Sequence, residues 1–415
     1  MKHIIKYILP VALLAPAMLL AQEPVLPLDS ILQRIDRNNL LLQSYGLKAE
    51  SYQYSADAAG AWMAPMAGLG TFMTPYPGKK VMESEKGNLM LQIEQDIPNT
   101  AKLNAKKKYI RSQGNVERAN RAITLNDFKA QAKRLYANWL VAERRIRILQ
   151  DNEKLLGMMQ KIEEVRYPYN QSQLGSVYKA EAQLADNSNM IRMQEGIIAK
   201  SRAWLNSLMN APGNTSFAID TLYEPGFAPM AGFDTAALAT VRKDVFKMNE
   251  SIRSMQLNIE SMQQEKKPDF RVRFDHMFPL SAGMPNAFSL MGMVSIPIVP
   301  WTSKMYKSEI RAMEYSIAGM EKEKSAMLQE TQGMLYGMQY EIQSMQKRIA
   351  AMDSKIIPSL KKTLDANFLA YQENKIQLPA VMDAWEAVNM MQLDLLDEQL
   401  KLYEMIVDYE KELYR

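Results

Sequence analysis

The sequence predicts a mixed α and β membrane protein, in which long antiparallel helices carry four β-strands that contribute to a barrel shared between chains. Three features of the sequence support this fold class. Two helix-like segments are much longer than a compact domain holds, four segments read as strands with one apolar face, and one turn motif occurs twice, about half a chain apart. Together they indicate a duplicated unit of helix, β-hairpin, long helix, tip and helix.

The chain begins with a segment that is typical of a secretory signal. Two lysines precede an apolar run from Tyr7 to Leu20, and the small residue Ala21 follows it. We therefore expect residues 1–21 to be a signal peptide and the mature chain to start near Gln22, in the cell envelope. The sequence has no Cys, which excludes disulfides, and its net charge of +4 gives no argument for a nucleic-acid partner. No later apolar run is long enough for a transmembrane helix.

The first repeat is expected at residues 22–210. Pro65 ends its first helix, and the segment from Leu89 to Ile97 then alternates between apolar and polar residues, as a half-buried strand does. A helix from Leu103 to about Val165 would be roughly 95 Å long at 1.5 Å per residue. The expected elements are a helix to about Ala61, a β-hairpin at about 66–97, a long helix to about Val165, a tip at about 167–180 and a helix to 210.

The second repeat follows a Pro- and Gly-rich connector at residues 211–234 and covers residues 235–415. Pro268 ends its first helix as Pro65 ends the first helix of the other repeat. The expected elements are a helix to about Lys267, a β-hairpin at about 269–297, a long helix that bends near Pro358, a tip at about 371–384 and a last helix.

The two tips read YPYNQSQLGSVYKA from Tyr167 and YQENKIQLPAVMDA from Tyr371, and they are identical at six of fourteen places. Both have Asn at the fourth place, Asn170 and Asn374. Asn is the best residue after Gly for the left-handed backbone conformation. Each tip is therefore predicted to be a tight turn between two helices.

The four strands have a length that suits a transmembrane β-barrel, with apolar side chains outward and charged side chains inward. Four strands cannot close a barrel, and open edges in lipid leave backbone groups without hydrogen bonds. Several chains must therefore share one barrel, and three chains would supply twelve strands. The charged residues expected to face the lumen are Glu94, Asp96, Arg271, Arg273 and Asp275.

The order of elements, the duplication, the Ile-Pro pair after each return strand (Ile97-Pro98 and Ile296-Pro297) and the Tyr, Val and Ala of the tips resemble the TolC family of outer-membrane efflux proteins. The resemblance implies a homotrimer, with a 12-stranded β-barrel in the outer membrane and a trimeric α-barrel across the periplasm. It also implies a periplasmic membrane-fusion adaptor and an inner-membrane pump as partners.

The same resemblance assigns roles to residues at the tips. Asp383 falls where the family has an acidic ring that narrows the entrance, and Lys179 is its counterpart in the first copy, so the two are expected to form the gate. The family commonly has Gly where this chain has Asn170 and Asn374, which leaves the identity of the adaptor open. The residues expected to dock the adaptor are Tyr169, Asn170, Gln171, Glu373, Asn374 and Lys375.

Met is unusually frequent, with 32 residues, and recurs every seven residues along the second long helix, apart from one step of four. A Met seam beside small residues suits close helix packing. Thioethers are also soft ligands for Cu(I), so a copper or silver path is the alternative. The residues that could make transient metal contacts are His276, Met277, Met284, Met291 and Met293.

The sequence gives no sign of an enzyme, because it has no Cys, two His and no recognisable nucleophile-base pair or phosphate loop. No cofactor is expected. The predicted function is the outer-membrane channel of a tripartite efflux system, with Cu(I), Ag(I) or other heavy metals as candidate cargo. Drug or small-molecule efflux, type I secretion and, from a different class, a structural coiled-coil envelope protein are the alternatives.

Overall fold

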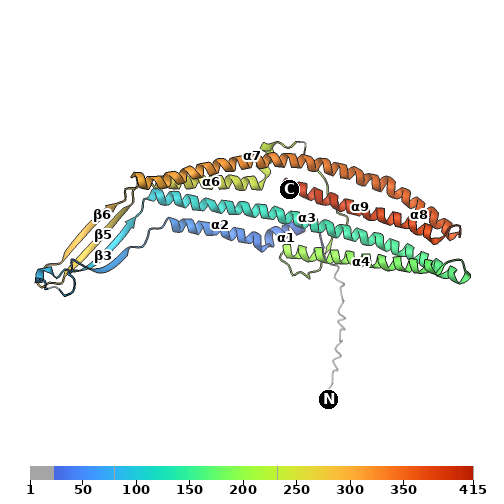
Figure 1. Cartoon of the computed structure of the whole chain (residues 1–415), viewed down its shortest axis with the longest axis horizontal. Coiled ribbons are helices and arrows are strands. Elements are labelled where there is room, and N and C mark those ends of the chain that lie inside the picture. The colour runs from blue at the N-terminus through green and yellow to red at the C-terminus, as the bar shows by residue number, and fades with distance from the viewer. Residues whose placement is uncertain (1–22, 79, 231, 415) are drawn as a thin grey trace, which may run out of the picture.

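The computed structural model describes residues 23–78, 80–230 and 232–414, so the expected signal peptide at 1–21 lies outside the described residues. The molecule is elongated (Figure 1). A small β-sheet forms one end, long helices run side by side away from it, and the two helix-to-helix turns lie together at the opposite end. The sheet and the tips are therefore separated by the length of the longest helices.

The first half of the chain contains one helix of 67 residues, α3, which spans most of the molecule. Its elements are β1 (Val25–Leu26), α1 (Leu28–Asn38), α2 (Leu40–Ala59), β2 (Met66–Phe72), a 3-10 turn (Glu83–Glu85), β3 (Asn88–Ile97), α3 (Thr100–Arg166), a second 3-10 turn (Tyr167–Tyr169) and α4 (Leu174–Leu208). The short strand β1 pairs in parallel with β4 of the connector, which fixes the start of the described chain beside the middle of the molecule.

The second half repeats this order, with one irregularity in its long helix. Its elements are β4 (Ala218–Ile219), α5 (Thr235–Val241), α6 (Lys243–Gln264), β5 (Phe270–Pro279), β6 (Ala287–Val294), α7 (Pro300–Ala351), a π-helical turn (Met352–Ile356), α8 (Ile357–Gln372) and α9 (Leu378–Glu412). The π-helical turn lies directly before Pro358, where the sequence predicts a bend. Proline lacks the N–H that would continue regular helical hydrogen bonding, so irregular backbone at this place has a physical cause.

The helix predicted up to Ala61 is interrupted at Asn39, and its counterpart in the second half is interrupted at Arg242. Both residues are extended, with φ and ψ of −66° and 122° at Asn39 and −69° and 124° at Arg242. Asn39 is buried, its side chain caps α2 by accepting from the N–H groups of Leu41 and Leu42, and it donates to the carbonyl oxygen of Leu208 at 3.0 Å. The residue therefore favours a break because its side chain satisfies backbone groups at the start of α2 and at the end of α4.

The four longer strands form one antiparallel sheet in the order β2-β3-β5-β6. The two hairpins join through β3 and β5, whose register runs from Asn88 opposite Pro279 to Ile97 opposite Phe270. Apolar residues such as Ile93, opposite Phe274, occupy one face and are exposed. Among the described residues the sheet is open, because β2 and β6 each have one neighbour.

The hydrophobic core is divided along the helices rather than gathered in one centre. One cluster, around Tyr136 and Trp139, joins α1, α3, α4 and the connector near the middle of the molecule. A second lies at the tips, around Tyr371 and Trp385. No helix in the described part of the chain is both long enough and apolar enough to cross a membrane.

Candidate functional site

The two tips have the same backbone geometry. Asn170 and Asn374 are left-handed, with φ of 56° and 60°, which confirms the turn predicted from the sequence. In each tip two N–H groups donate back to the end of the preceding helix in a Schellman motif, which satisfies carbonyls that the helix leaves unpaired. The hydrogen bonds run from Asn170 to Tyr167 (3.1 Å), Gln171 to Arg166 (3.2 Å), Asn374 to Tyr371 (2.9 Å) and Lys375 to Ala370 (2.8 Å).

The residues that the sequence proposes for adaptor docking are all exposed at the end of the molecule. Tyr169 has 73% of its surface accessible, and Lys375 forms an ion pair with Glu373 at 2.5 Å. The six residues are Tyr169, Asn170, Gln171, Glu373, Asn374 and Lys375. The tips therefore present aromatic, amide and charged groups together to the solvent.

A buried polar cluster, which the sequence did not indicate, joins the two tips. The carboxylate of Glu163, on α3, is only 3% exposed and accepts hydrogen bonds from the hydroxyls of Tyr371 and Ser172. Arg166 donates to the carbonyl oxygens of Tyr371 at 2.8 Å and Gln372 at 3.1 Å, and its guanidinium lies 4.7 Å from the centre of the Tyr371 ring. The cluster links the first helix hairpin to the second.

Burial and the neighbouring Glu163 carboxylate raise the pKa of Tyr371 far above its usual range. Both effects disfavour a negative charge on the phenol oxygen, so Tyr371 stays a hydrogen-bond donor at any physiological pH. The tip cluster therefore keeps its arrangement under ordinary conditions.

The proposed gate residues, Asp383 and Lys179, are both exposed near the starts of α9 and α4. No ion pair joins them within the described chain. The two residues therefore do not form a gate by direct contact within one chain, and a role for Asp383 and Lys179 depends on the neighbours that each residue meets in an assembly.

The charged residues of the strands share one face of the sheet, as the alternation predicts. Arg271 forms ion pairs with Glu94 at 2.8 Å and with Asp96 at 2.5 Å, and Arg273 pairs with Asp275 at 2.8 Å. Asp96 stands opposite Arg271, and Glu94 opposite Arg273, in the register of β3 and β5. Charges of opposite sign thus alternate across neighbouring strands, and Glu94 and Asp275 are buried beneath their partners.

The five residues proposed for metal contact do not come together. The register places Met277, Met291 and Met293 on the charged face, whereas His276 lies on the apolar face, opposite Leu91 and Phe288. Met284 lies in the loop between β5 and β6 and is 48% exposed. No group of three or more His, Asp or Glu side chains that could hold a metal ion occurs in the described ranges.

The Met seam of the second long helix takes part in packing. Met327, Met338 and Met345 are partly buried against a cluster formed by α7, α9 and the connector. The small residues that precede these methionines, Ala326, Gly337 and Ser344, are exposed. The packing interpretation is therefore supported for the methionines, while the small-residue side of α7 is left uncovered in a single chain.

No protein-family model matches the sequence, and no curated protein matches it. Solved structures do match its fold. The outer-membrane channel OprN has a TM-score of 0.74 at 12% identity, and the match covers 93% of this chain and 89% of that one. CusC has a TM-score of 0.74 at 14% identity and coverages of 93% and 91%. The outer membrane protein VceC from Vibrio cholerae has a TM-score of 0.69 at 14% identity and coverages of 93% and 95%.

These matches cover nearly the whole of each chain, so the likeness includes the sheet, the long helices and the tips. The chain therefore has the fold of outer-membrane channels. The arrangement of long helices, strands and tips within one chain, which the resemblance to the TolC family implies, is thereby confirmed.

Proposed function

We propose that three copies of this chain form the outer-membrane channel of a tripartite efflux system. One observation carries the proposal: an open four-stranded sheet, apolar on one face and charged on the other, stands at the end of a long helical body. Pairing of β6 in one copy with β2 in the next would remove both edges and close a barrel of twelve strands. The apolar face would then meet lipid, and the charged face, with Glu94, Arg271 and Arg273, would line a wet lumen.

The apolar face of the sheet has the exposure that a lipid-facing surface requires. The exposed fractions are 72% for Leu69, 71% for Phe288 and 68% for Leu290. A contiguous apolar face of this kind marks a protein or membrane contact, because the exposure of a large apolar area to water is unfavourable. A structural coiled-coil envelope protein, the alternative from another class, has no need of such a sheet.

The internal repeat also indicates how neighbouring copies pack. Within one chain α3 packs against α6, where Ser112 donates to Ser254 at 2.8 Å and Asn115 donates to Glu250 at 3.1 Å. The duplication makes α7 the counterpart of α3, and α2 the counterpart of α6. We therefore propose that α2 of one copy packs against α7 of the next.

The exposed surfaces of α2 and α7 suit this contact. On α2, Leu40, Leu47 and Tyr54 are 61%, 69% and 76% exposed, and they lie opposite the buried row that packs on α3. On α7, a Cβ added to Gly319 or Gly333 would meet no atom within 4 Å. In the proposed contact a row of large side chains on one copy would face a row of Gly and Ala residues on the next.

In the assembly the helices would continue the channel through the periplasm as an α-barrel, and the tips would form its entrance. The exposed residues Tyr169 to Gln171 and Glu373 to Lys375 would dock a periplasmic adaptor, which connects the channel to an inner-membrane pump. Asp383, repeated three times, would narrow and charge the entrance. Small organic molecules and Cu(I) or Ag(I) are the cargo classes that this proposal leaves to experiment.

The proposal is tested by the purified full-length protein. We expect a trimer that is resistant to detergent and dissociates on heating, found in the outer-membrane fraction, with single-channel conductance in planar bilayers. Gly319→Leu should weaken the trimer, because the new side chain occupies the space for α2 of the next copy. Glu321→Leu, on another side of α7, is the matched control. A monomeric protein without conductance would refute the proposal.

A further inference from the structure

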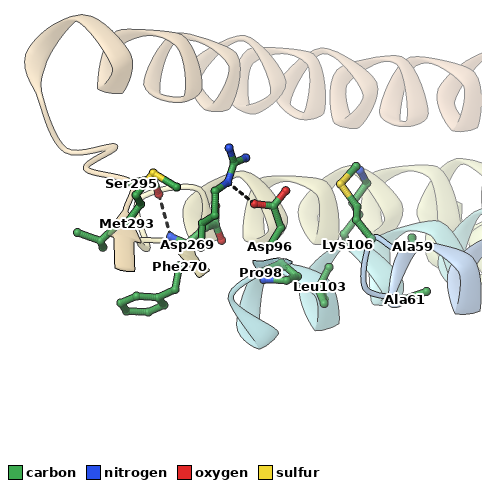
Figure 2. Close-up of a pocket in the computed structure, with 13 residues that line it drawn as sticks. Ala59, Ala61, Asp96, Pro98, Leu103, Lys106, Asp269, Phe270, Met293 and Ser295 are labelled. Carbon is green, nitrogen blue, oxygen red and sulfur yellow. Dashed lines mark hydrogen bonds and ion pairs between the residues drawn. The ribbon is translucent and has the colours of Figure 1, made fainter. Parts of the chain in front are cut away.

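A pocket of about 640 Å³ lies where the sheet joins the helices. It is bounded by the end of α2 and the segment after it, the start of α3 and the adjoining ends of β3, β5 and β6 (Figure 2). Its volume is within the range of sites that hold drug-sized molecules, about 300 to 1,000 Å³. We call it the junction pocket.

The lining of the junction pocket is mainly apolar. Its apolar lining residues include Met63, Leu103 and Met293, whereas the ring of Phe270 points away from the other labelled residues (Figure 2). Thioethers adapt to flat or irregular apolar groups. The pocket therefore suits the apolar body of an organic molecule better than a hydrated ion.

The carboxylates of the pocket already have cations. Asp96 pairs with Arg271 at 2.5 Å, as the dashed line in Figure 2 shows. Asp269 pairs with Lys102 at 2.6 Å and also accepts from the backbone N–H of Asn99 at 2.9 Å. A cationic ligand would have to compete with these partners, so the two carboxylates give no free negative site.

Lys106 is different from these groups, since it is the one charged lining residue in the described part of the chain that has no ion pair. Figure 2 shows it beside Leu103 at the α2 and α3 side of the pocket. Lys106 is therefore the lining charge that a ligand could meet without displacing an ion-pair partner. The matching place at the start of α7 is Met305, taking the two Ile-Pro pairs as equivalent, so this charge belongs to only one of the two junctions.

We propose that the junction pocket binds an amphipathic organic anion of drug size, with the anionic group at Lys106 and the apolar body against Met63, Leu103 and Met293. This inference rests on the proposed channel, because three such pockets would then ring the passage between the helical part and the sheet. It names the class of cargo that the passage would hold in transit: an apolar or aromatic molecule with one negative charge.

The test compares two fluorescent probes with the same aromatic body, anilinonaphthalene sulfonate, which is anionic, and N-phenylnaphthylamine, which is neutral. Binding is titrated on the purified full-length protein in one detergent. We expect Lys106→Gln to weaken binding of the sulfonate about fivefold, the upper end for an exposed ion pair. Binding of the neutral probe should not change. Lys108→Gln, on the same helix and outside the pocket, is the matched control.

Equal weakening in the two lysine variants, or no weakening in either, would overturn the proposal. Ag⁺ is titrated in parallel, because Met63 and Met293 are thioethers. Tight Ag⁺ binding that is lost in the Met63→Leu, Met293→Leu double variant, without selective binding of the sulfonate, would assign the pocket to a soft cation instead. Conductance in planar bilayers is measured separately, so a channel without sulfonate selectivity contradicts only this inference.

Discussion

Tyr167 and Tyr371 occupy the same place in two copies of one turn, but they have different surroundings. Tyr371 is fully buried and donates to Glu163, whereas Tyr167 is 43% exposed. The places on α8 that correspond to Glu163 and Arg166 are Asn367 and Ala370, which cannot supply the same carboxylate and guanidinium. The two copies of the turn thus share one backbone conformation. The tyrosine of the second copy makes its contacts within the chain, whereas the tyrosine of the first copy is exposed.

The largest difference between the copies is expected from removing the two hydroxyls. Tyr371→Phe leaves the buried Glu163 carboxylate without one of its donors, which should lower the free energy of tip opening by about 2 kcal/mol. Tyr167→Phe removes an exposed hydroxyl and should change it by less than about 0.5 kcal/mol. Hydrogen exchange of the tip amides measures both. Equal effects would show that the Glu163 contact does not distinguish the copies.

A change to the turn backbone should affect both copies alike. Asn170→Ala and Asn374→Ala each place a side chain that disfavours left-handed backbone at a positive φ, at a cost of about 1 kcal/mol. Asn→Gly at either position should have no such cost, because Gly adopts this conformation freely. Proteolysis rates within each tip give the comparison. A marked effect in only one copy would mean that the two turns differ in more than their side-chain contacts.

Alkaline pH should loosen the tips through Tyr371. An unfolded tyrosine loses its proton near pH 10, whereas burial and Glu163 keep the pKa of Tyr371 above that value. Above about pH 10 the opened tip therefore binds fewer protons than the folded tip. The free energy needed to open the folded tip then falls as the pH rises. The rate of limited proteolysis within the tips should therefore increase between pH 9 and 11, and this increase should be less steep in Tyr371→Phe.

The alkaline effect has to be measured as cleavage within the tips themselves. Burial also raises the pKa of Tyr136 and of Tyr414 to about 12, and both residues lie away from the tips. Their ionisation would destabilise other parts of the molecule, in the unmodified protein and in Tyr371→Phe alike. A proteolysis rate that rises in parallel in the unmodified protein and in Tyr371→Phe would assign the effect to those residues.

The smallest effect is expected at the charges that differ between the copies. Asp383→Ala should raise single-channel conductance about twofold or less, because it removes a charge from the proposed constriction while leaving the buried cluster intact. Lys179→Ala, at the corresponding place of the first copy, is the comparison. Unchanged conductance in Asp383→Ala would remove Asp383 from the gate.

Much of the fold was predictable because it follows from periodicity. The alternation in β3 and β5, the length of α3 and the repeated tips each leave a regular pattern in the sequence, and the positive φ of both Asn residues follows from their chemistry. The breaks at Asn39 and Arg242 were not predicted, because neither Pro nor Gly marks the sequence at these two places. Asn39 caps α2 through the nearby N–H groups of Leu41 and Leu42, but the contact of its amide N–H with Leu208 is distant in sequence.

The candidate site was predicted less completely, because part of it also depends on contacts between segments that are distant in sequence. The exposed tip residues and the shared face of the strand charges depend on local spacing. The Glu163 cluster depends on α3 and α8 lying together, and nothing in the sequence near Glu163 marks that carboxylate as buried. The metal set was grouped by closeness in sequence, although in a strand successive residues such as His276 and Met277 point to opposite faces.

The pairing of β3 with β5 also has a consequence for how the chain folds. Each hairpin joins strands that are close in sequence. Ile97 and Phe270, in contrast, pair although α3, α4, the connector and α6 lie between them in the chain. Closing so long a loop is entropically unfavourable until other contacts hold its ends together, and contacts of large sequence separation form slowly. We therefore expect the helices to assemble first, with the complete sheet as a late step in folding.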